Sequence, residues 1–386
     1  MRRASTIKLA TIGALACLLP ALVRASDTRT NAPSFEFKLP RGIPQELWSY
    51  FIPNDNPMTA AKVELGKALF FDARLSANGT VSCASCHDPK RAFTDGKTVA
   101  EGIDGRHGVR NSPTLLNAMF NTGQFWDGRA ATLEDQAKMP LTNPVEMGNG
   151  SLDEVAAKIG AIPEYANGFK QVFGGAVTID GFAKAIAAFE RTLISGDSPL
   201  DRYLAGDLNA LADSARSGLA LFRSKARCGV CHALNQNFAA FATFPFLTDG
   251  NYRNTGVAAN FKGFDALAQR AMAASRDDGS SAIVELRRHE RAGELGRFAI
   301  SGNTLDIGAF RTPSLRNVAL TAPYFHDGSA AALADVVRYY VKGGNENPNR
   351  DWQLEAVTLT ESEQRDLIEF LKALTSDDAR VTAERR

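Results

Sequence analysis

Two short motifs carry the clearest chemistry in this sequence, and each combines two cysteines with a histidine. They read Cys-Ala-Ser-Cys-His at 83–87 and Cys-Gly-Val-Cys-His at 228–232. This spacing is the attachment signature of a c-type haem, in which both thiols bind the haem vinyl groups covalently and the histidine is the proximal iron ligand. We therefore predict two covalent haem c groups, held by Cys83, Cys86 and His87 and by Cys228, Cys231 and His232.

Cysteine usage favours haem attachment over disulfide bonding. Of the five cysteines, four belong to the two motifs and the fifth is Cys17. A disulfide framework is the ordinary alternative for four cysteines in an exported protein. Here each pair is three residues apart and is followed directly by histidine, so we expect haem attachment instead.

The start of the chain is typical of an exported protein. A basic beginning, a short apolar run over 9–23 and small residues before Ser26 predict a signal peptide over 1–25, cleaved near Ala25, and a periplasmic mature protein. A lipid anchor at Cys17 is the alternative. Removing 1–25 removes four positive charges, so the net charge of +1 becomes −3, which gives no indication of a nucleic-acid partner.

Hydrophobic periodicity predicts a mainly α-helical fold with long loops around the haems. The 386 residues are 44% hydrophobic, enough for two cores. Strand signals are scarce, and residues 26–57 and 238–310 look irregular. Helices are expected over 59–71, after a capping box at 151–154, over 182–193, near 211–223, over 330–341 and after a capping box at 360–363.

The two halves of the chain repeat each other. The sequence Gly-Lys-Ala-Leu-Phe at 66–70 is matched by Gly-Leu-Ala-Leu-Phe at 218–222, each just before a haem motif. After the haem motifs, Phe-Trp-Asp-Gly at 125–128 is matched by Phe-His-Asp-Gly at 325–328. The repeat predicts a duplicated monohaem domain. The expected divisions are a signal peptide (1–25), an N-terminal arm (26–50) and two haem domains (51–195 and 196–386).

The halves differ at a few chemically informative positions. Trp126 in the first half corresponds to His326 in the second, while Gln136 and Glu146 have no polar counterpart. This asymmetry suggests that one haem performs chemistry and the other supplies electrons.

Longer motifs resemble the bacterial dihaem cytochrome c peroxidase family, which includes the MauG enzymes. The resemblance covers about residues 45–375 and is carried by the runs at 125–129, 143–147, 312–317 and 323–328. It implies that the Cys83–His87 haem reacts with hydrogen peroxide and that the Cys228–His232 haem transfers electrons. It also implies a small electron donor, a cytochrome c or a cupredoxin, and a homodimer.

The resemblance further assigns individual residues. Trp126 would relay electrons between the haems, and Glu146 and Gln136 would lie in the distal pocket, where a carboxylate can act as general base and then acid in peroxide cleavage. Asn111 and the carbonyls of Thr321 and Pro323 would bind one Ca²⁺, a hard cation that prefers oxygen ligands. The plainer alternatives are an exposed loop carboxylate for Glu146, core packing for Trp126 and a turn residue for Asn111.

The sequence departs from the family pattern at two ligand positions. Ile103 stands where resting peroxidases often carry a removable histidine ligand, so we expect a five-coordinate first haem, with His107 as a displaced alternative ligand. Tyr340 stands where most members place methionine, and no methionine follows His326. As in MauG-type members, Tyr340 would be the distal ligand of the second haem, favouring ferric iron, whereas Tyr339 would pack outside the site.

Three functions fit these features. The first is a periplasmic peroxidase that reduces hydrogen peroxide to water with electrons from a small redox protein. The second is a MauG-like oxidase that uses peroxide to oxidise Tyr or Trp of a partner protein through a high-valent dihaem state. The third is a plain electron-transfer cytochrome.

Overall fold

The computed structural model describes residues 35, 37–234, 244–276, 284–286, 289 and 291–377, and it is mostly helical, as predicted. The signal peptide and Cys17 lie outside the described residues. Within them, no helix combines the length and apolarity that crossing a membrane requires. The main elements are α1 (Gln45–Tyr50), α2 (Ala60–Phe71), α3 (Cys83–Cys86), α4 (Leu133–Thr142), α5 (Leu152–Gly160), α6 (Pro163–Phe173), α7 (Ile179–Glu190), α8 (Pro199–Leu204), α9 (Asp213–Arg223), α10 (Phe264–Ala274), α12 (Phe298–Ser301), α13 (Leu333–Val341), α14 (Glu361–Lys372), β1 (Tyr252–Arg253) and β2 (Phe310–Arg311).

Most helix predictions are confirmed. The last helix, α14, begins with a capping box in which the Thr360 hydroxyl accepts from the Glu363 amide and the Glu363 carboxylate accepts from the Thr360 amide. Two predictions of irregular structure were wrong. Residues 26–57 contain α1, and residues 238–310 contain α10 and both short strands. The periodic face of α10 is largely alanine, which is a weak hydrophobic signal although the face is buried.

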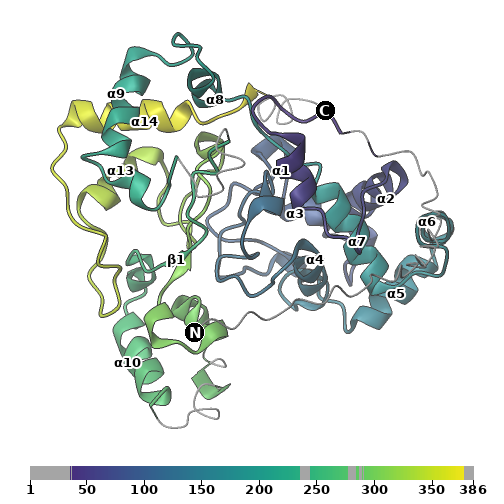
Figure 1. Ribbon diagram of the computed structural model, residues 1–386. Helices are drawn as coiled ribbons and strands as arrows, with labels where there is room; N and C mark the ends of the chain where they lie inside the picture. Colours follow the sequence, from purple (N-terminus) through teal and green to yellow (C-terminus); the bar gives the residue numbers. More distant parts are fainter. Residues whose placement is uncertain are drawn as a thin grey trace, which may run out of the picture. The chain divides into compact units, whose positions relative to one another are not determined.

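The first core forms around α2, α4 and α7, which pack together (Figure 1). Gly66 marks the crossing of α2 and α7, because a Cβ there would lie 1.9 Å from the Ala185 carbonyl oxygen. Phe70 of α2 is fully buried and its ring lies 5.1 Å from that of Phe189. This packing fixes the end of α2, from which the chain continues into the first haem motif.

The second core is built the same way from α9, α13 and α14 (Figure 1). Gly218 marks the crossing of α9 and α14, where a Cβ would lie 2.0 Å from the Asp366 carbonyl oxygen. The rings of Phe222 and Phe370 pack at 5.0 Å. A third, smaller cluster gathers α10 and the residues around Phe298 and Phe310.

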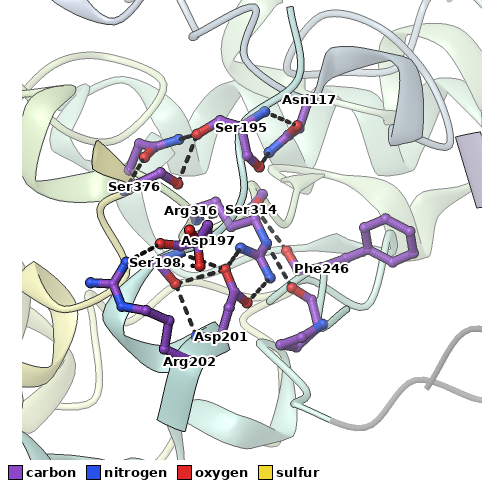
Figure 2. Close-up of polar contacts among 12 residues, drawn as sticks. Asn117, Ser195, Asp197, Ser198, Asp201, Arg202, Phe246, Ser314, Arg316 and Ser376 are labelled. Atoms are coloured by element: carbon purple, nitrogen blue, oxygen red, sulfur yellow. Dashed lines mark hydrogen bonds and ion pairs between the residues drawn. The ribbon is translucent and has the colours of Figure 1, made fainter. Parts of the chain in front are cut away.

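A hydrogen-bonded junction lies between the first two cores (Figure 2). Asn117 donates to the Ser195 carbonyl and accepts from its amide. The Ser195 hydroxyl bonds the Ser376 hydroxyl at 2.8 Å and accepts from Asn317 at 2.9 Å. All four residues are buried. The end of the first core is thereby tied to the end of the second.

Candidate functional site

The two motif histidines are oriented by backbone carbonyls. Nδ1 of His87 lies 3.1 Å from the Phe93 carbonyl oxygen, and Nδ1 of His232 lies 2.9 Å from that of Leu247. A carbonyl can only accept, so each Nδ1 carries the proton and each Nε2 keeps its lone pair. Burial lowers the pKa of both imidazoles. Both features suit neutral imidazole as an iron ligand.

None of the four motif cysteines forms a disulfide bond. The first pair lies at the two ends of the single-turn helix α3, which Ser82 and Ser85 cap. Burial raises the pKa of Cys83, Cys86 and Cys228 to about 12. The absence of disulfide bonds and the burial of the sulfur atoms both fit covalent haem attachment at these cysteines.

A cavity in the C-terminal half brings the second motif and Tyr340 together. Its wall includes Cys228, Cys231, His232 and Tyr340. The remaining wall is largely apolar and includes Phe222, Leu315, Val337, Leu367 and Leu371. Two thiols, an imidazole and an apolar wall are the set that a covalent haem needs, so the residues fit this cofactor.

Tyr340 and its neighbour Tyr339 project differently from α13. Tyr340 lines the cavity, whereas the Tyr339 hydroxyl donates to the Thr255 carbonyl at 2.9 Å and accepts from the Asn345 amide at 3.2 Å. Successive helical residues are rotated by about 100°. Burial, with the neighbouring Tyr339 and the motif thiols, raises the pKa of Tyr340. A metal cation in the cavity would oppose this and favour the tyrosinate.

Glu146 lies close to the first haem motif. Its carboxylate accepts from Asn143, the residue that ends α4, at 3.0 Å. Its charge contributes to the raised pKa of both Cys83 and Cys86, which places it near their thiols. Burial raises the pKa of Glu146 while Arg129 opposes the shift. Such a carboxyl is suited to taking up and releasing a proton.

Gln136 lies on α4, and its side chain is half-buried. α4 is therefore the element that carries both distal-pocket candidates, Gln136 within the helix and Glu146 just beyond its end. No hydrogen bond of the Gln136 amide occurs among the described residues, so its two donors are available to a ligand.

The glycine-rich loop supports the segment that carries Glu146. The Ile103 amide lies 3.1 Å from the Val145 carbonyl and 2.9 Å from the Glu146 carbonyl. A Cβ at Gly102 would lie 2.0 Å from the Val145 carbonyl oxygen, so only glycine permits this approach. The Ile103 side chain is buried, whereas His107 is exposed. The loop thus contributes an apolar residue and backbone donors beside Glu146.

Trp126 belongs to the first half of the chain and lies on the wall of the cavity that holds the second motif. Its indole Nε1 donates to the Asn111 carbonyl at 2.9 Å, and its ring centroid lies 6.5 Å from that of His326. His326 stacks on Phe310 at 3.6 Å, and its Nε2 lies 3.0 Å from a carboxylate oxygen of Glu294. Sequence reasoning missed Glu294, because its partner is 32 residues away and the intervening stretch has few periodic signals.

The three calcium candidates all line this cavity. Asn111, Thr321 and Pro323 all line it. The Asn111 side-chain amide donates to the Lys97 carbonyl at 2.8 Å, which leaves its oxygen as a potential ligand. Among the described residues, no three His, Cys, Asp or Glu side chains gather as a metal site. A cation here would therefore be held mainly by neutral oxygens.

Comparisons with known proteins agree with this arrangement. Residues 60–209 match the family described as di-haem cytochrome c peroxidase. The chain is 37% identical over 364 residues to the methylamine utilization protein MauG of Methylorubrum extorquens, covering 94% of this chain and 90% of that protein. It is 38% identical over 323 residues to cytochrome c551 peroxidase of Nitrosomonas europaea, covering 83% and 82%.

A solved structure is similar over nearly the whole chain. It is the crystal structure of a MauG-like protein associated with microbial copper homeostasis, with a TM-score of 0.72 and 32% sequence identity. The similarity covers 90% of this chain and 97% of that one.

Proposed function

Because the chain belongs to the di-haem cytochrome c peroxidase family, which includes proteins named MauG, we propose that it reduces hydrogen peroxide with electrons from a small redox protein. It is a haem peroxidase with haem c cofactors. The observation that supports the proposal is the presence of two histidines that backbone carbonyls orient, one in each haem motif, with Tyr340 on the wall of the cavity that holds the second motif. Bound haem supplies the redox chemistry, and the side chains supply protons, orientation and an electron path.

Glu146 and Gln136 would act on peroxide beside the haem at Cys83–His87. The Glu146 carboxylate takes the proton from one peroxide oxygen and returns it to the departing oxygen, so that water leaves. The raised pKa of Glu146 and its hydrogen bond from the Asn143 side chain suit that proton exchange. The free amide of Gln136 would orient the peroxide. His107 is exposed and on the far part of the loop, so we propose that the first haem has no sixth protein ligand.

Trp126 would connect the two haem environments. Its ring lines the cavity of the second haem, and its indole is anchored to Asn111 of the first half. An aromatic ring in this position would serve as an intermediate site for electron transfer between the two haems. We propose Tyr340 as the distal ligand of the second haem, which would then resist reduction more than a His/Met haem does.

Several finer assignments belong to the same proposal. The duplication is supported by matching backbone conformations 200 residues apart, with φ of 62° and 61° at Asn117 and Asn317 and of 65° and 70° at Phe125 and Phe325. The boundary near 195–196 is supported by the buried cores, because the first draws most of its residues from 43–194, with Phe244 and Phe246 added, and the second begins at Leu200. We also propose export through a signal peptide over 1–25, a Ca²⁺ bound by Asn111, Thr321 and Pro323, and a homodimer.

Steady-state kinetics with hydrogen peroxide and a reduced small cytochrome c or cupredoxin tests the main function. We expect turnover by the wild type and a loss of about 100-fold or more in kcat for Glu146→Gln, which keeps the shape but cannot exchange the proton. Asp153→Asn, on the exposed start of α5, is the control and should retain activity. Negligible wild-type turnover with every donor would refute a peroxidase role.

A second function is favoured by Tyr340, namely peroxide-driven oxidation of Tyr or Trp in a partner protein. It requires that oxidising equivalents persist after peroxide is consumed. Peroxide added to the ferric protein should then give an absorption change that lasts for minutes in the wild type and decays much faster in Tyr340→Phe. EPR spectra of the ferric wild type and of ferric Tyr340→Phe test whether Tyr340 is a haem ligand. If it is, only the low-spin signal should differ between the two proteins. Immediate return to the ferric spectrum in the wild type would count against this role.

A further inference from the structure

Arg311 is a buried positive charge that no carboxylate of the described residues balances. It is 6% exposed. Its hydrogen bonds go to neutral oxygens, with Nη1 donating to the Asn121 side chain at 3.0 Å and Nε to the Phe125 carbonyl at 3.5 Å. A guanidinium stays protonated in proteins, and burying a charge without a counterion is costly. The environment therefore calls for an anion that the polypeptide does not provide.

The other two buried arginines of the described residues are each paired with a carboxylate. Arg191 is paired with Glu134 at 2.7 Å, and Arg316 is paired with Asp201 through two bonds of 2.9 and 2.8 Å (Figure 2). Both pairs match the two-pronged geometry that guanidinium and carboxylate prefer. Arg311 is the exception among these three.

Arg311 is held where a cofactor anion would meet it. It lies on the wall of the cavity that contains Cys228, Cys231, His232 and Tyr340. Its backbone is fixed by the β1–β2 pairing with Tyr252 and by a 2.7 Å bond from its amide to the Trp126 carbonyl. Its Nη2 makes no hydrogen bond with any described residue. Burial lowers the pKa of Arg311 to about 10, which agrees with an environment that lacks a counterion.

We propose that Arg311 pairs with a propionate of the haem attached at Cys228 and Cys231. The inference rests on the haem placement in the proposed function. Once the vinyl groups have reacted with the thiols, the propionates are the anionic groups that haem c brings into the cavity. The position that corresponds to Arg311 in the first half is Asn111, which is neutral, so the pairing would be specific to the second haem. A fixed cation beside this haem stabilises the reduced form of its iron.

The test is a potentiometric titration of the holoprotein, following each haem separately by absorption and EPR. In Arg311→Gln, with both haems attached, we expect the ferric–ferrous equilibrium of the second haem to move about tenfold toward ferric, equivalent to about 59 mV. Arg311→Lys, which keeps the positive charge, should return the midpoint of the second haem most of the way to the wild-type value. An unchanged midpoint, or a change confined to the haem at Cys83 and Cys86, would overturn the proposal.

The double variant Asp201→Asn/Arg316→Gln is the matched control, because Arg316 lines the same cavity but is balanced by Asp201, so that replacing both leaves the net charge beside the cavity unchanged. It should lower stability while leaving the second haem's midpoint unchanged. If Arg311→Gln does not fold, Arg311→Lys decides the question. Lysine cannot form the two-pronged pair, so the propionate bending band in resonance Raman should shift, and an unshifted band would overturn the pairing. Pyridine haemochrome analysis tests the haem placement on which the inference rests. If the wild type carries no haem at Cys228 and Cys231, the proposed function fails, and this outcome is distinct from a failure of the Arg311 pairing.

Discussion

At the scale of single residues, burial sets the behaviour of ionisable side chains that belong to no recognisable motif. Cysteine spacing alone predicts the attachment sites, because thioether formation requires a fixed separation along the chain. The status of Arg311 and Glu190 depends on which distant residues surround them. Glu190 follows a plain helical pattern, yet it is 3% exposed and its Oε2 has no hydrogen-bond partner among the residues that the structure describes.

Glu190 should make the protein's stability depend on pH. Burial raises its pKa to about 8, above the value near 4.5 expected in the unfolded chain. The folded state then holds the proton more tightly, so stability falls as pH rises from about 4.5 to 8 and levels off beyond. Glu190→Gln cannot ionise and should match the wild type near pH 5 but exceed it at pH 9 by roughly 5 kcal/mol, at about 1.4 kcal/mol per tenfold change in acidity.

Denaturant unfolding of the holoprotein at several pH values between 5 and 9 measures this effect. Glu164→Gln, on the exposed face of α6, is the control and should follow the wild type throughout. Parallel pH profiles for the wild type and Glu190→Gln would show that Glu190 is ionised at no cost in the folded protein.

At the scale of elements, caps and periodicity located the helices, but their contacts needed the structure. The repeated Gly-x-Ala-Leu-Phe runs were visible in the sequence. Their cause is visible only in the fold, where Gly66 and Gly218 are the points at which α2 crosses α7 and α9 crosses α14. Sequence periodicity describes one helix at a time, whereas a crossing depends on two faces brought together by the chain between them.

Alanine at either crossing glycine should destabilise the protein. The new Cβ would meet a backbone carbonyl at 1.9 Å for Gly66 and at 2.0 Å for Gly218, so the helices must separate. We expect a loss of about 2–3 kcal/mol, because overpacking outweighs the roughly 1 kcal/mol that alanine gains in helix propensity. Chemical denaturation measures it, with Gly175→Ala, which has open space around it, as the control. Wild-type stability in Gly66→Ala and Gly218→Ala would show that the crossings are looser than described.

At the scale of the whole molecule, the proposed function requires two haem environments held in a fixed relation. The described residues from 35 to 377 belong to one compact unit, and the buried junction at Ser195 joins its two larger cores (Figure 2). The sequence predicts a domain boundary at 195–196 through the run Ser-Gly-Asp-Ser-Pro at 195–199, which is typical of a break in a helix. It did not indicate that Ser195 would bond Asn317 and Ser376, since those partners are 122 and 181 residues away. The segment at 195–199 therefore both ends a helix and, through Ser195, connects the two cores.

Ser195→Ala should weaken the coupling between the two cores. It removes the hydroxyl that accepts from Asn317 and bonds Ser376, and it leaves the Asn317 amide buried without that partner. We expect a loss of about 1–3 kcal/mol, the cost of an unsatisfied buried polar group. Because the lost bonds join the ends of two cores, calorimetry should show a broadened or split transition in place of one cooperative transition. Ser224→Ala, which removes a single exposed hydrogen bond within the second core, should leave a single transition. An unaltered transition in Ser195→Ala would mean that the cores are held together chiefly by apolar packing and by the shared cavity.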